Sequence, residues 1–396
     1  MKSKRLWMAA FIAATGVLLL ASVAFAAPAL TLEEQLGKHL FFDENLSLHG
    51  NQSCASCHAP ESGWTGATSD VNAHEGGYEG SIAGAFGDRK PPSSAYATQS
   101  PVFHRGREGL FVGGNFWDGR ATGEKLGNPA ADQAQGPFLN PKEQALQEPV
   151  DVVMKVCAGG YVELFKQVWG ADLCEPANVD KAYDAIGLSI AAYEGSPEVN
   201  AFTSKYDQSF KSKVKLTKIE QKGLALFQGK GKCKLCHLSG KNALFTDFTF
   251  DHLGIPLNPE NPVYDYNPTF IDPGLGGFLA SQQDYEEYAE ESMGMHKVPT
   301  LRNVDLRPYP GFVKAYGHNG YFKSLWSIVH FYNTRDVLPA CPGDYTEAEA
   351  LAADCWPAPE VAENVNMAEL GDLGLTRAEE EAIVAFLRTL SDGYRP

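Results

Sequence analysis

The chain has 396 residues, of which 44% are hydrophobic and 11% aromatic. This length suits about two domains of roughly 150 residues each, and the apolar content excludes a largely disordered chain. The formal net charge of −16 at pH 7 argues against a nucleic-acid partner, because an acidic surface repels phosphates.

The N-terminus has the pattern of a secretory signal. Three basic residues in the first five positions precede an apolar run over 7–25, which ends in Ala24-Phe25-Ala26. We predict that residues 1–26 are a signal peptide and that the mature chain, with net charge −19 after these three basic residues are lost, begins at Ala27. An uncleaved anchor is the alternative, because the run is just long enough to cross a bilayer. After cleavage we expect no stable membrane insertion.

A helix and a cysteine motif follow. Residues 31–42 have helical periodicity, and Thr31 with Glu34 can form a capping box at the start. A polar turn then leads to Cys54-Ala55-Ser56-Cys57-His58. This pattern is the attachment signature of c-type haem: the two thiols can add to the vinyl groups of one porphyrin, and His58 can bind the iron as proximal ligand.

The next segment, residues 59–145, is rich in Gly, Pro, Ser and Asn but contains scattered aromatic residues. This composition indicates ordered loops around a cofactor. Helical patterning returns at 150–156, 161–169 and 179–193. It lapses between Ser196 and Lys215, so we predict two domains, 27–196 and 197–396.

The second half repeats the arrangement of the first. Residues 217–227 form an amphipathic helix that Thr217 and Glu220 can cap, and Cys233-Lys234-Leu235-Cys236-His237 follows. We interpret this as a duplicated cytochrome c-like unit with two covalently bound c-type haems, the second ligated by His237. Two zinc half-sites are the alternative, but zinc ligands usually lie closer together in the chain.

The remainder is again loop-rich. Five prolines exclude a long helix over 240–297, and helical patterning resumes at 324–333 and 376–390. We find no long alternating strand pattern. The expected fold is mainly α, with two loop-rich cytochrome c-like domains that hold one c-type haem each.

Four cysteines lie outside the haem motifs. Of the three ways to pair them, Cys157–Cys174 with Cys341–Cys355 is favoured, because each pair closes one loop within one half. Such disulfides persist in an oxidising compartment. Free buried thiols are the alternative.

Further sequence blocks accompany the haem motifs. They are Leu40-Phe41-Phe42, Phe116-Trp117-Asp118-Gly119-Arg120, Gly136-Pro137-Phe138-Leu139-Asn140-Pro141-Lys142-Glu143, Val298-Pro299-Thr300-Leu301-Arg302-Asn303-Val304, and His318-Asn319-Gly320 leading to Tyr332-Asn333. With them the chain resembles the bacterial di-haem cytochrome c peroxidase and MauG family over about 32–394. The resemblance implies a periplasmic di-haem enzyme that reacts with hydrogen peroxide at one haem.

The resemblance also implies roles for individual residues. The open, peroxide-binding haem is the N-terminal one, held by His58, and Glu143 matches the family's distal acid/base group. Gln133 matches the neighbouring amide, with six more residues between it and Trp117 than the family pattern has. Trp117 matches the tryptophan between the haems, which can relay an electron. The plain alternatives are a solvated carboxylate at Glu143 and a core tryptophan at Trp117.

In this family the second haem has a sixth ligand, which is a methionine in the peroxidases and a tyrosine in MauG. The matching position is Tyr332, with a buried structural tyrosine as the alternative. The competing ligands are Met293, Met295 and Met367. His74 lies where some peroxidases carry a displaceable second ligand to the first iron, and a surface-loop histidine is the alternative.

Family members often bind calcium between the domains through an asparagine. This chain has Lys90 at the matching position, and a lysine cannot supply an oxygen ligand. Asp88 could substitute, so calcium binding is left open.

Three functional hypotheses result. The first is a cytochrome c peroxidase that takes electrons from a small cytochrome c or cupredoxin. The second is a MauG-like enzyme that uses high-valent haem iron to oxidise residues of a partner protein. The third is a di-haem electron carrier or sensor with both irons six-coordinate and no enzymatic activity. The sequence does not decide whether the chain forms a homodimer.

Overall fold

The computed structural model describes residues 29–211 and 214–395. The predicted signal peptide, residues 1–26, lies outside the described residues. Within these two ranges, no helix combines the length and the apolar character that a membrane span requires.

Helices dominate the regular structure. The α-helices of the described residues are α1 (Leu32–Phe41), α2 (Cys54–Cys57), α3 (Ser69–His74), α4 (Pro129–Leu139), α5 (Pro149–Ala158), α6 (Val162–Trp169), α7 (Val179–Gly195), α8 (Lys205–Phe210), α9 (Lys218–Gln228), α10 (Val263–Tyr266), α11 (Gly274–Leu279), α12 (Leu325–Thr334), α13 (Glu347–Ala353) and α14 (Arg377–Leu387). The strands are β1 (His104–Arg105), β2 (Phe111–Val112), β3 (Phe250–Asp251) and β4 (His296–Lys297). They form two antiparallel pairs, β1 with β2 and β3 with β4. The expected mainly helical, loop-rich fold is confirmed.

Two helices, α3 and α4, lie within the segment 59–145 that was expected to be loops, and α4 is the longer. α4 begins where the Asn128 side chain accepts a hydrogen bond of 2.9 Å from the amide of Ala130, with Pro129 in its first turn. Pro137 lies inside the last turn. The sequence Gly136-Pro137 suggested a loop, but a proline and a glycine near the end of a helix interrupt few hydrogen bonds.

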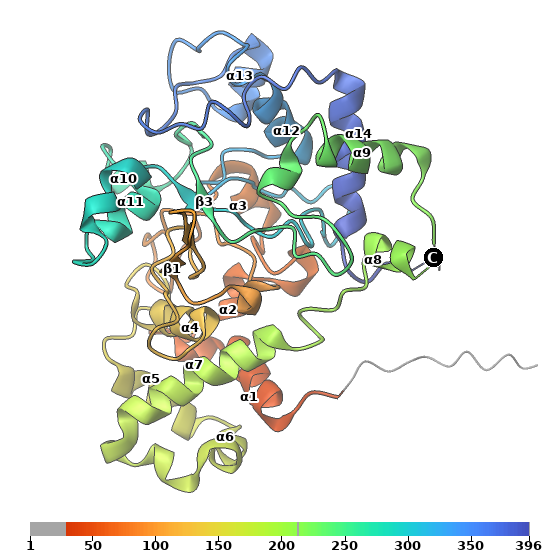
Figure 1. Cartoon of the computed structure of the whole chain (residues 1–396). Coiled ribbons are helices and arrows are strands. Elements are labelled where there is room, and N and C mark those ends of the chain that lie inside the picture. The colour runs from red at the N-terminus through yellow and green to blue at the C-terminus, as the bar shows by residue number, and fades with distance from the viewer. Residues whose placement is uncertain (1–28, 212–213, 396) are drawn as a thin grey trace, which may run out of the picture.

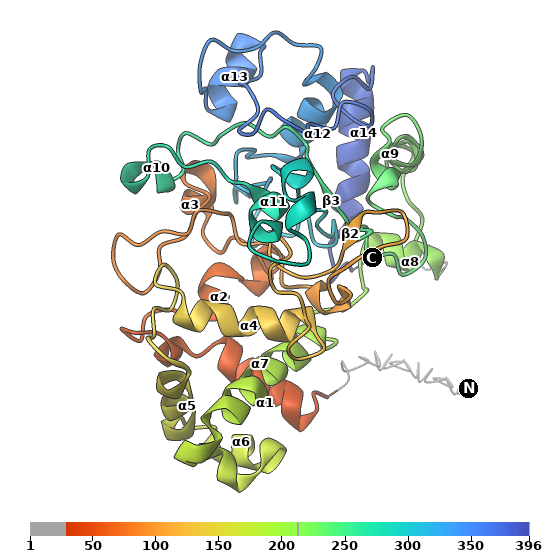
Figure 2. The same cartoon turned by 60° about the vertical axis from the view of Figure 1, so that its left-hand side comes forward.

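The elements fall into two groups along the chain (Figures 1 and 2). α1, α5, α6 and α7 lie at one end of the molecule, and α9, α12, α13 and α14 lie at the other. Each group has its own hydrophobic core. A smaller cluster joins the two halves, because Phe103 and Phe111 of the first half pack with Phe250 and Leu275 of the second.

The same helix pair occurs in both halves. α1 packs on α7, and α9 packs on α14. The approach is close: a Cβ atom on Gly37 would lie 1.8 Å from the Ser189 carbonyl oxygen, and one on Gly223 would lie 1.8 Å from that of Ala382. Any side chain at either glycine would force the helices apart. Because Gly37 meets Ser189 and Gly223 meets Ala382, these contacts also align α7 with α14 residue by residue, with Ser189 corresponding to Ala382.

Candidate active site

The first Cys-x-x-Cys-His motif lines a cavity of about 540 Å³. Cys54 and Cys57 begin and end α2, and His58 follows directly. The Nδ1 atom of His58 lies 3.1 Å from the Trp64 carbonyl oxygen. Burial lowers the pKa of His58 to about 4, so the imidazole is neutral. A neutral imidazole whose Nδ1–H donates to a carbonyl leaves Nε2 free to bind iron.

The second motif repeats this geometry around a cavity of about 210 Å³. The Nδ1 atom of His237 lies 2.8 Å from the Phe245 carbonyl oxygen, and burial lowers the pKa of His237. Trp64 and Phe245 both have left-handed backbone conformations, with φ of 63° and 55°. Each half therefore orients its histidine in the same way, by a hydrogen bond to the carbonyl oxygen of a residue with a left-handed backbone conformation.

The cysteines divide into two sets. Those of the two motifs, Cys54, Cys57, Cys233 and Cys236, are free. The other four form Cys157–Cys174 and Cys341–Cys355, which confirms the expected local pairing. Four reduced thiols lining two cavities beside neutral histidines are the donor set that two c-type haems need.

α4 and the turn after it bring Gln133 and Glu143 to the first cavity. Asn140 Nδ2 donates to Glu143 Oε1 at 2.9 Å, and the amide of Ser81 donates to the Glu143 carbonyl oxygen at 2.6 Å. Burial raises the pKa of Glu143 to about 6, against the opposing charge of Arg120. A carboxyl group with this pKa can hold or accept a proton near neutral pH.

Trp117 lines both cavities. It is 8% exposed, and its Nε1 donates to the Lys90 carbonyl oxygen at 2.8 Å. The ammonium of Lys90 donates to Thr65 Oγ1 at 2.8 Å and to the Pro91 carbonyl oxygen at 2.9 Å, and it lies 6.0 Å from the centre of the Trp117 ring. Burial lowers the pKa of Lys90 to about 7. By the family resemblance, Lys90 matches an asparagine that binds calcium through its oxygen. Its side chain offers only a nitrogen, which calcium does not bind.

Tyr332 lines the second cavity from α12. Burial, and then the nearby thiols of Cys233 and Cys236, raise the pKa of the phenol. None of the competing methionines, all of which lie within the described ranges, lines this cavity. Met367, for example, is 64% exposed.

His74 lies away from the first cavity. Its side chain is 66% exposed and lies 3.8 Å from both Asp70 and Glu260. His74 ends helix α3 and does not lie in a loop, but its exposed side chain agrees with the surface position of the alternative, and we propose no ligand role for it.

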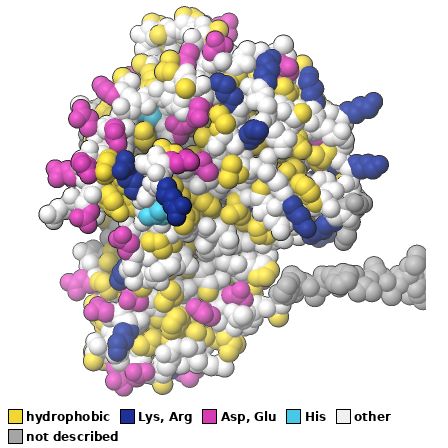
Figure 3. All heavy atoms as spheres, in the orientation of Figure 1, with side chains coloured by type: hydrophobic (Ala, Val, Ile, Leu, Met, Phe, Trp, Pro, Cys, Tyr) yellow, Lys and Arg dark blue, Asp and Glu magenta, His cyan; other side chains and the backbone are white. Residues whose placement is uncertain are grey.

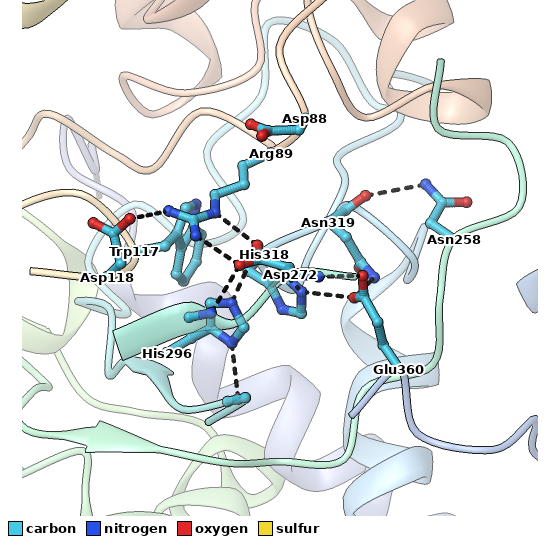
Figure 4. A network of polar contacts seen from close by, with 12 residues as sticks. Asp88, Arg89, Trp117, Asp118, Asn258, Asp272, His296, His318, Asn319 and Glu360 are labelled. Atoms are coloured by element: carbon cyan, nitrogen blue, oxygen red, sulfur yellow. Dashed lines mark hydrogen bonds and ion pairs between the residues drawn. The ribbon is translucent and has the colours of Figure 1, made fainter. Parts of the chain in front are cut away.

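The sequence analysis missed a buried charge network beside the second cavity (Figure 4). Arg89 donates to the two oxygens of Asp272 at 2.6 Å each, the rings of His296 and His318 stack with centroids 3.6 Å apart, and His318 Nε2 lies 3.2 Å from Glu360 Oε2. Asp272 and the two histidines are close enough to suggest a metal site. However, Arg89 already engages both Asp272 oxygens, so we interpret the network as a link between the two halves. Its residues come from four loops and from strand β4, which left no spacing pattern to detect.

The sequence analysis also missed Glu194 of α7, which lines the first cavity. Glu194 is 3% exposed, and its Oε2 atom has no hydrogen-bond partner among the described residues. Burial raises the pKa of Glu194 to about 8, so this carboxyl is protonated at neutral pH. The one signal for Glu194 is the alignment of α7 with α14. In that alignment the carboxyl of Glu194 corresponds to the apolar side chain of Leu387.

Two cavities, each with free motif thiols and an oriented neutral histidine, define a di-haem oxidoreductase. The comparisons with known proteins agree. The sequence model of the family described as di-haem cytochrome c peroxidase matches residues 32–215. The chain is 33% identical to the methylamine utilization protein MauG of Paracoccus denitrificans over 383 residues, which cover 94% of this chain and 92% of that protein.

Other relatives carry peroxidase names. Cytochrome-c peroxidase IdrP2 of Pseudomonas sp. (strain SCT) is 29% identical over 90% of this chain and 80% of its own length. The crystal structure of the diheme peroxidase BthA from Burkholderia thailandensis superimposes with a TM-score of 0.75 at 28% identity, covering 91% of this chain and 86% of that one. The chain belongs to the di-haem cytochrome c peroxidase and MauG family of oxidoreductases.

Proposed function

We propose that the mature protein is a periplasmic di-haem peroxidase that reduces hydrogen peroxide at the His58 haem with electrons passed through the His237 haem. The observation that carries this proposal is the inequality of the two cavities. The first cavity has an acid/base residue, Glu143, at its wall, and the second has a phenol, Tyr332. The first is also the larger, at about 540 Å³ against 210 Å³.

The haems, when bound, supply the iron chemistry that cleaves peroxide. The chain supplies the rest. His58 and His237 would hold the two irons, and the thiols of the two motifs would attach the porphyrins covalently. Glu143 accepts a proton from one peroxide oxygen and returns it to the other, while Asn140 fixes the carboxyl by its hydrogen bond of 2.9 Å. Gln133 lies on the same cavity wall and can hydrogen-bond the oxidant.

Two further residues act between and at the haems. Trp117 lies at the wall of both cavities, where an indole can relay an electron from one haem to the other. Tyr332, which lines the same cavity as His237, would supply a second protein ligand to the iron held there. A tyrosine in this place favours the MauG-type variant of the function, in which the oxidising equivalents are used on residues of a partner protein, because phenolate stabilises the oxidised iron.

The domain organisation follows from the same proposal. Residues 27–196 form the unit of the peroxide-binding haem, and residues 197–396 form the unit of the electron-transfer haem, after removal of 1–26 as a signal peptide. Calcium is not part of the proposal, because Lys90 presents an ammonium where the resemblance expects a calcium-binding asparagine.

The Glu143→Gln variant tests the proposal. We expect it to keep both haems attached but to slow the reaction with hydrogen peroxide by roughly 10²- to 10⁴-fold, followed by stopped-flow absorbance. The matched control is Glu124→Gln, an exposed carboxylate in the loop before α4, which should react at the wild-type rate. Equal rates for the Glu143→Gln variant and the wild type would remove Glu143 from the mechanism. An EPR spectrum with both haems low-spin and no cyanide binding would support an electron carrier or sensor instead.

A further inference from the structure

One segment of this acidic chain is strongly basic. Between positions 205 and 241 the sequence has ten lysines and only two acidic residues, although the whole chain has 33 basic and 49 acidic residues. The segment comprises α8, α9 and the second haem motif. In Figure 3, Lys and Arg side chains gather on the upper right of the molecule, over α9 and α14, whereas Asp and Glu side chains dominate the left.

Few of these lysines are neutralised. Both acidic residues of the segment are already engaged, because Asp207 pairs with Arg302, and Glu220 pairs with Lys205 at 2.6 Å. Lys230 pairs with Glu379 at 2.8 Å. The remaining lysines in the described part of the segment form no ion pair there; they are Lys211, Lys215, Lys218, Lys222, Lys232, Lys234 and Lys241, all exposed. We call them, with Lys230, the lysine face.

The lysine face includes two exposed apolar residues, one within the second haem motif and one directly after it. Leu235 and Leu238 are 47% and 53% exposed. Lys232 and Leu235 belong to the wall of the second cavity as well as to the surface. A protein seated on these residues would therefore lie directly over part of the wall of the second cavity. Exposed apolar residues ringed by like charges are typical of an electron-transfer interface, where charge steers the encounter and a small apolar area forms the contact.

We propose that the lysine face docks an acidic one-electron redox protein, which reduces the His237 haem. This assignment rests on the proposed function and is opposite to what the net charge suggests, since an overall acidic protein favours a basic partner. Each docking event transfers one electron from the reduced partner to the second haem and leaves the partner oxidised. Two such events supply the two electrons that, with two protons, convert one hydrogen peroxide to two waters.

The test uses the haem-loaded, oxidised protein and two reduced probes, an acidic cupredoxin and a basic mitochondrial-type cytochrome c. Stopped-flow absorbance gives the second-order rate constant for reduction of the second haem, without peroxide, at low and high ionic strength. For the wild type we expect the acidic probe to be the faster at low salt and its rate constant to fall as salt rises. The basic probe should reduce the second haem slowly at low salt, and its rate constant should not fall as the salt concentration rises.

The variant is Lys222→Glu with Lys241→Glu, and the matched control is Lys155→Glu with Lys181→Glu in α5 and α7 of the other half. We expect the variant to lose about 10-fold or more in the rate constant with the acidic probe at low salt, and the control to change less than about 2-fold. A wild type that the basic probe reduces faster, or a variant equal to the control, overturns the proposal.

A third reductant separates this inference from the proposed function. A small uncharged hydroquinone needs no docking surface, so the wild type and both double variants should turn over peroxide with it at equal rates. Absence of peroxide turnover with hydroquinone in all three proteins would refute the proposed function while leaving the docking measurement intact. A loss confined to the lysine-face variant would mean that the substitutions damage the haem site, and would overturn the docking interpretation of its slower reduction.

Discussion

The buried ion pair between Arg302 and Asp207 gives the sharpest stability prediction. Both groups are fully buried, with 0% and 3% of their side chains exposed, and two hydrogen bonds of 2.9 Å join them. Arg302 also donates to the Ala243 carbonyl oxygen at 2.7 Å. Its guanidinium lies 5.0 Å from the ring centre of Tyr96 and 4.3 Å from that of Phe202. The guanidinium of this pair thus contacts an aromatic ring of the first half, Tyr96, as well as one of the second half, Phe202.

We expect Asp207→Asn to lower the free energy of unfolding by about 3–5 kcal/mol, because it leaves a buried guanidinium without a counter-charge. Arg302→Met should cost less. Asp207 would keep the hydrogen bonds from the Ser204 amide and hydroxyl, at 3.1 and 2.6 Å, and could neutralise itself by taking up a proton. The double variant should therefore be more stable than the sum of the single effects predicts.

The pH dependence follows from the same pair. Burial opposes ionisation of Asp207, but the hydrogen bonds from Arg302 outweigh it and hold the pKa of Asp207 below its ordinary value. A carboxyl with a lowered folded-state pKa stabilises the protein above its unfolded pKa of about 3.9, and this contribution is lost as the pH falls through the lower folded value. The gap between wild type and Asp207→Asn should accordingly narrow below about pH 4.

Guanidinium unfolding of the haem-loaded proteins, followed by far-UV circular dichroism, measures these differences. The control is the surface pair Arg377–Glu381, whose side chains are 64% and 56% exposed. Glu381→Gln should change the free energy of unfolding by less than about 0.5 kcal/mol. If Asp207→Asn is no more destabilising than Glu381→Gln, the buried pair does not stabilise the fold as argued.

Three further predictions concern the site and the disulfides. Because burial raises the pKa of Glu143 to about 6, the rate constant for peroxide should fall as the pH drops below 6, and Glu143→Gln should abolish this limb; a pH-independent wild type would contradict it. Trp117→Phe should leave peroxide binding intact but slow transfer of oxidising equivalents to the second haem at least about 10-fold in stopped-flow spectra, since phenylalanine is harder to oxidise; equal transfer rates would exclude the relay. Replacing Cys157 and Cys174 by alanine should lower the free energy of unfolding by about 3 kcal/mol, from the 17-residue separation; a loss below 1 kcal/mol would refute this.

Local signals in the sequence predicted much of the fold. The capping boxes at Thr31 and Thr217 are present as expected, with hydrogen bonds to Glu34 and Glu220 in both directions. Helices whose apolar residues recur at helical spacing, such as α7 and α14, were placed within two or three residues. α4 was missed, because its face toward the first cavity carries polar residues such as Gln133 and its end contains Pro137. A helix that builds a functional wall lacks the apolar stripe by which core helices are recognised.

From the residues alone, the candidate site was predictable only where chemistry requires residues adjacent in sequence. The haem motifs are of this kind, since two thiols and an imidazole must meet one porphyrin. Glu143, Gln133, Trp117 and Tyr332 came from the family resemblance, and all four line the cavities. Lys90 was recognised as a poor calcium ligand, but its contact with the Trp117 ring depends on loops that only the folded chain brings together. Arg89 and Asp272 lie 183 positions apart, so the sequence around either residue does not predict that they pair.

The duplicated scaffold explains how two equal units acquire unequal chemistry. Gly37 and Gly223 fix the same helix crossing, so α7 and α14 present equivalent positions to the two cavities. Ile190 and Ile383 occupy one such position, and both are buried against their cavities. At the next inward position the halves diverge, from the carboxyl of Glu194 to the hydrocarbon of Leu387. A buried, protonated carboxyl can release its proton when positive charge develops nearby, and a leucine cannot. The shared scaffold therefore places the two cavities alike, and single residues on it, such as Glu194 and Leu387, make their walls chemically different.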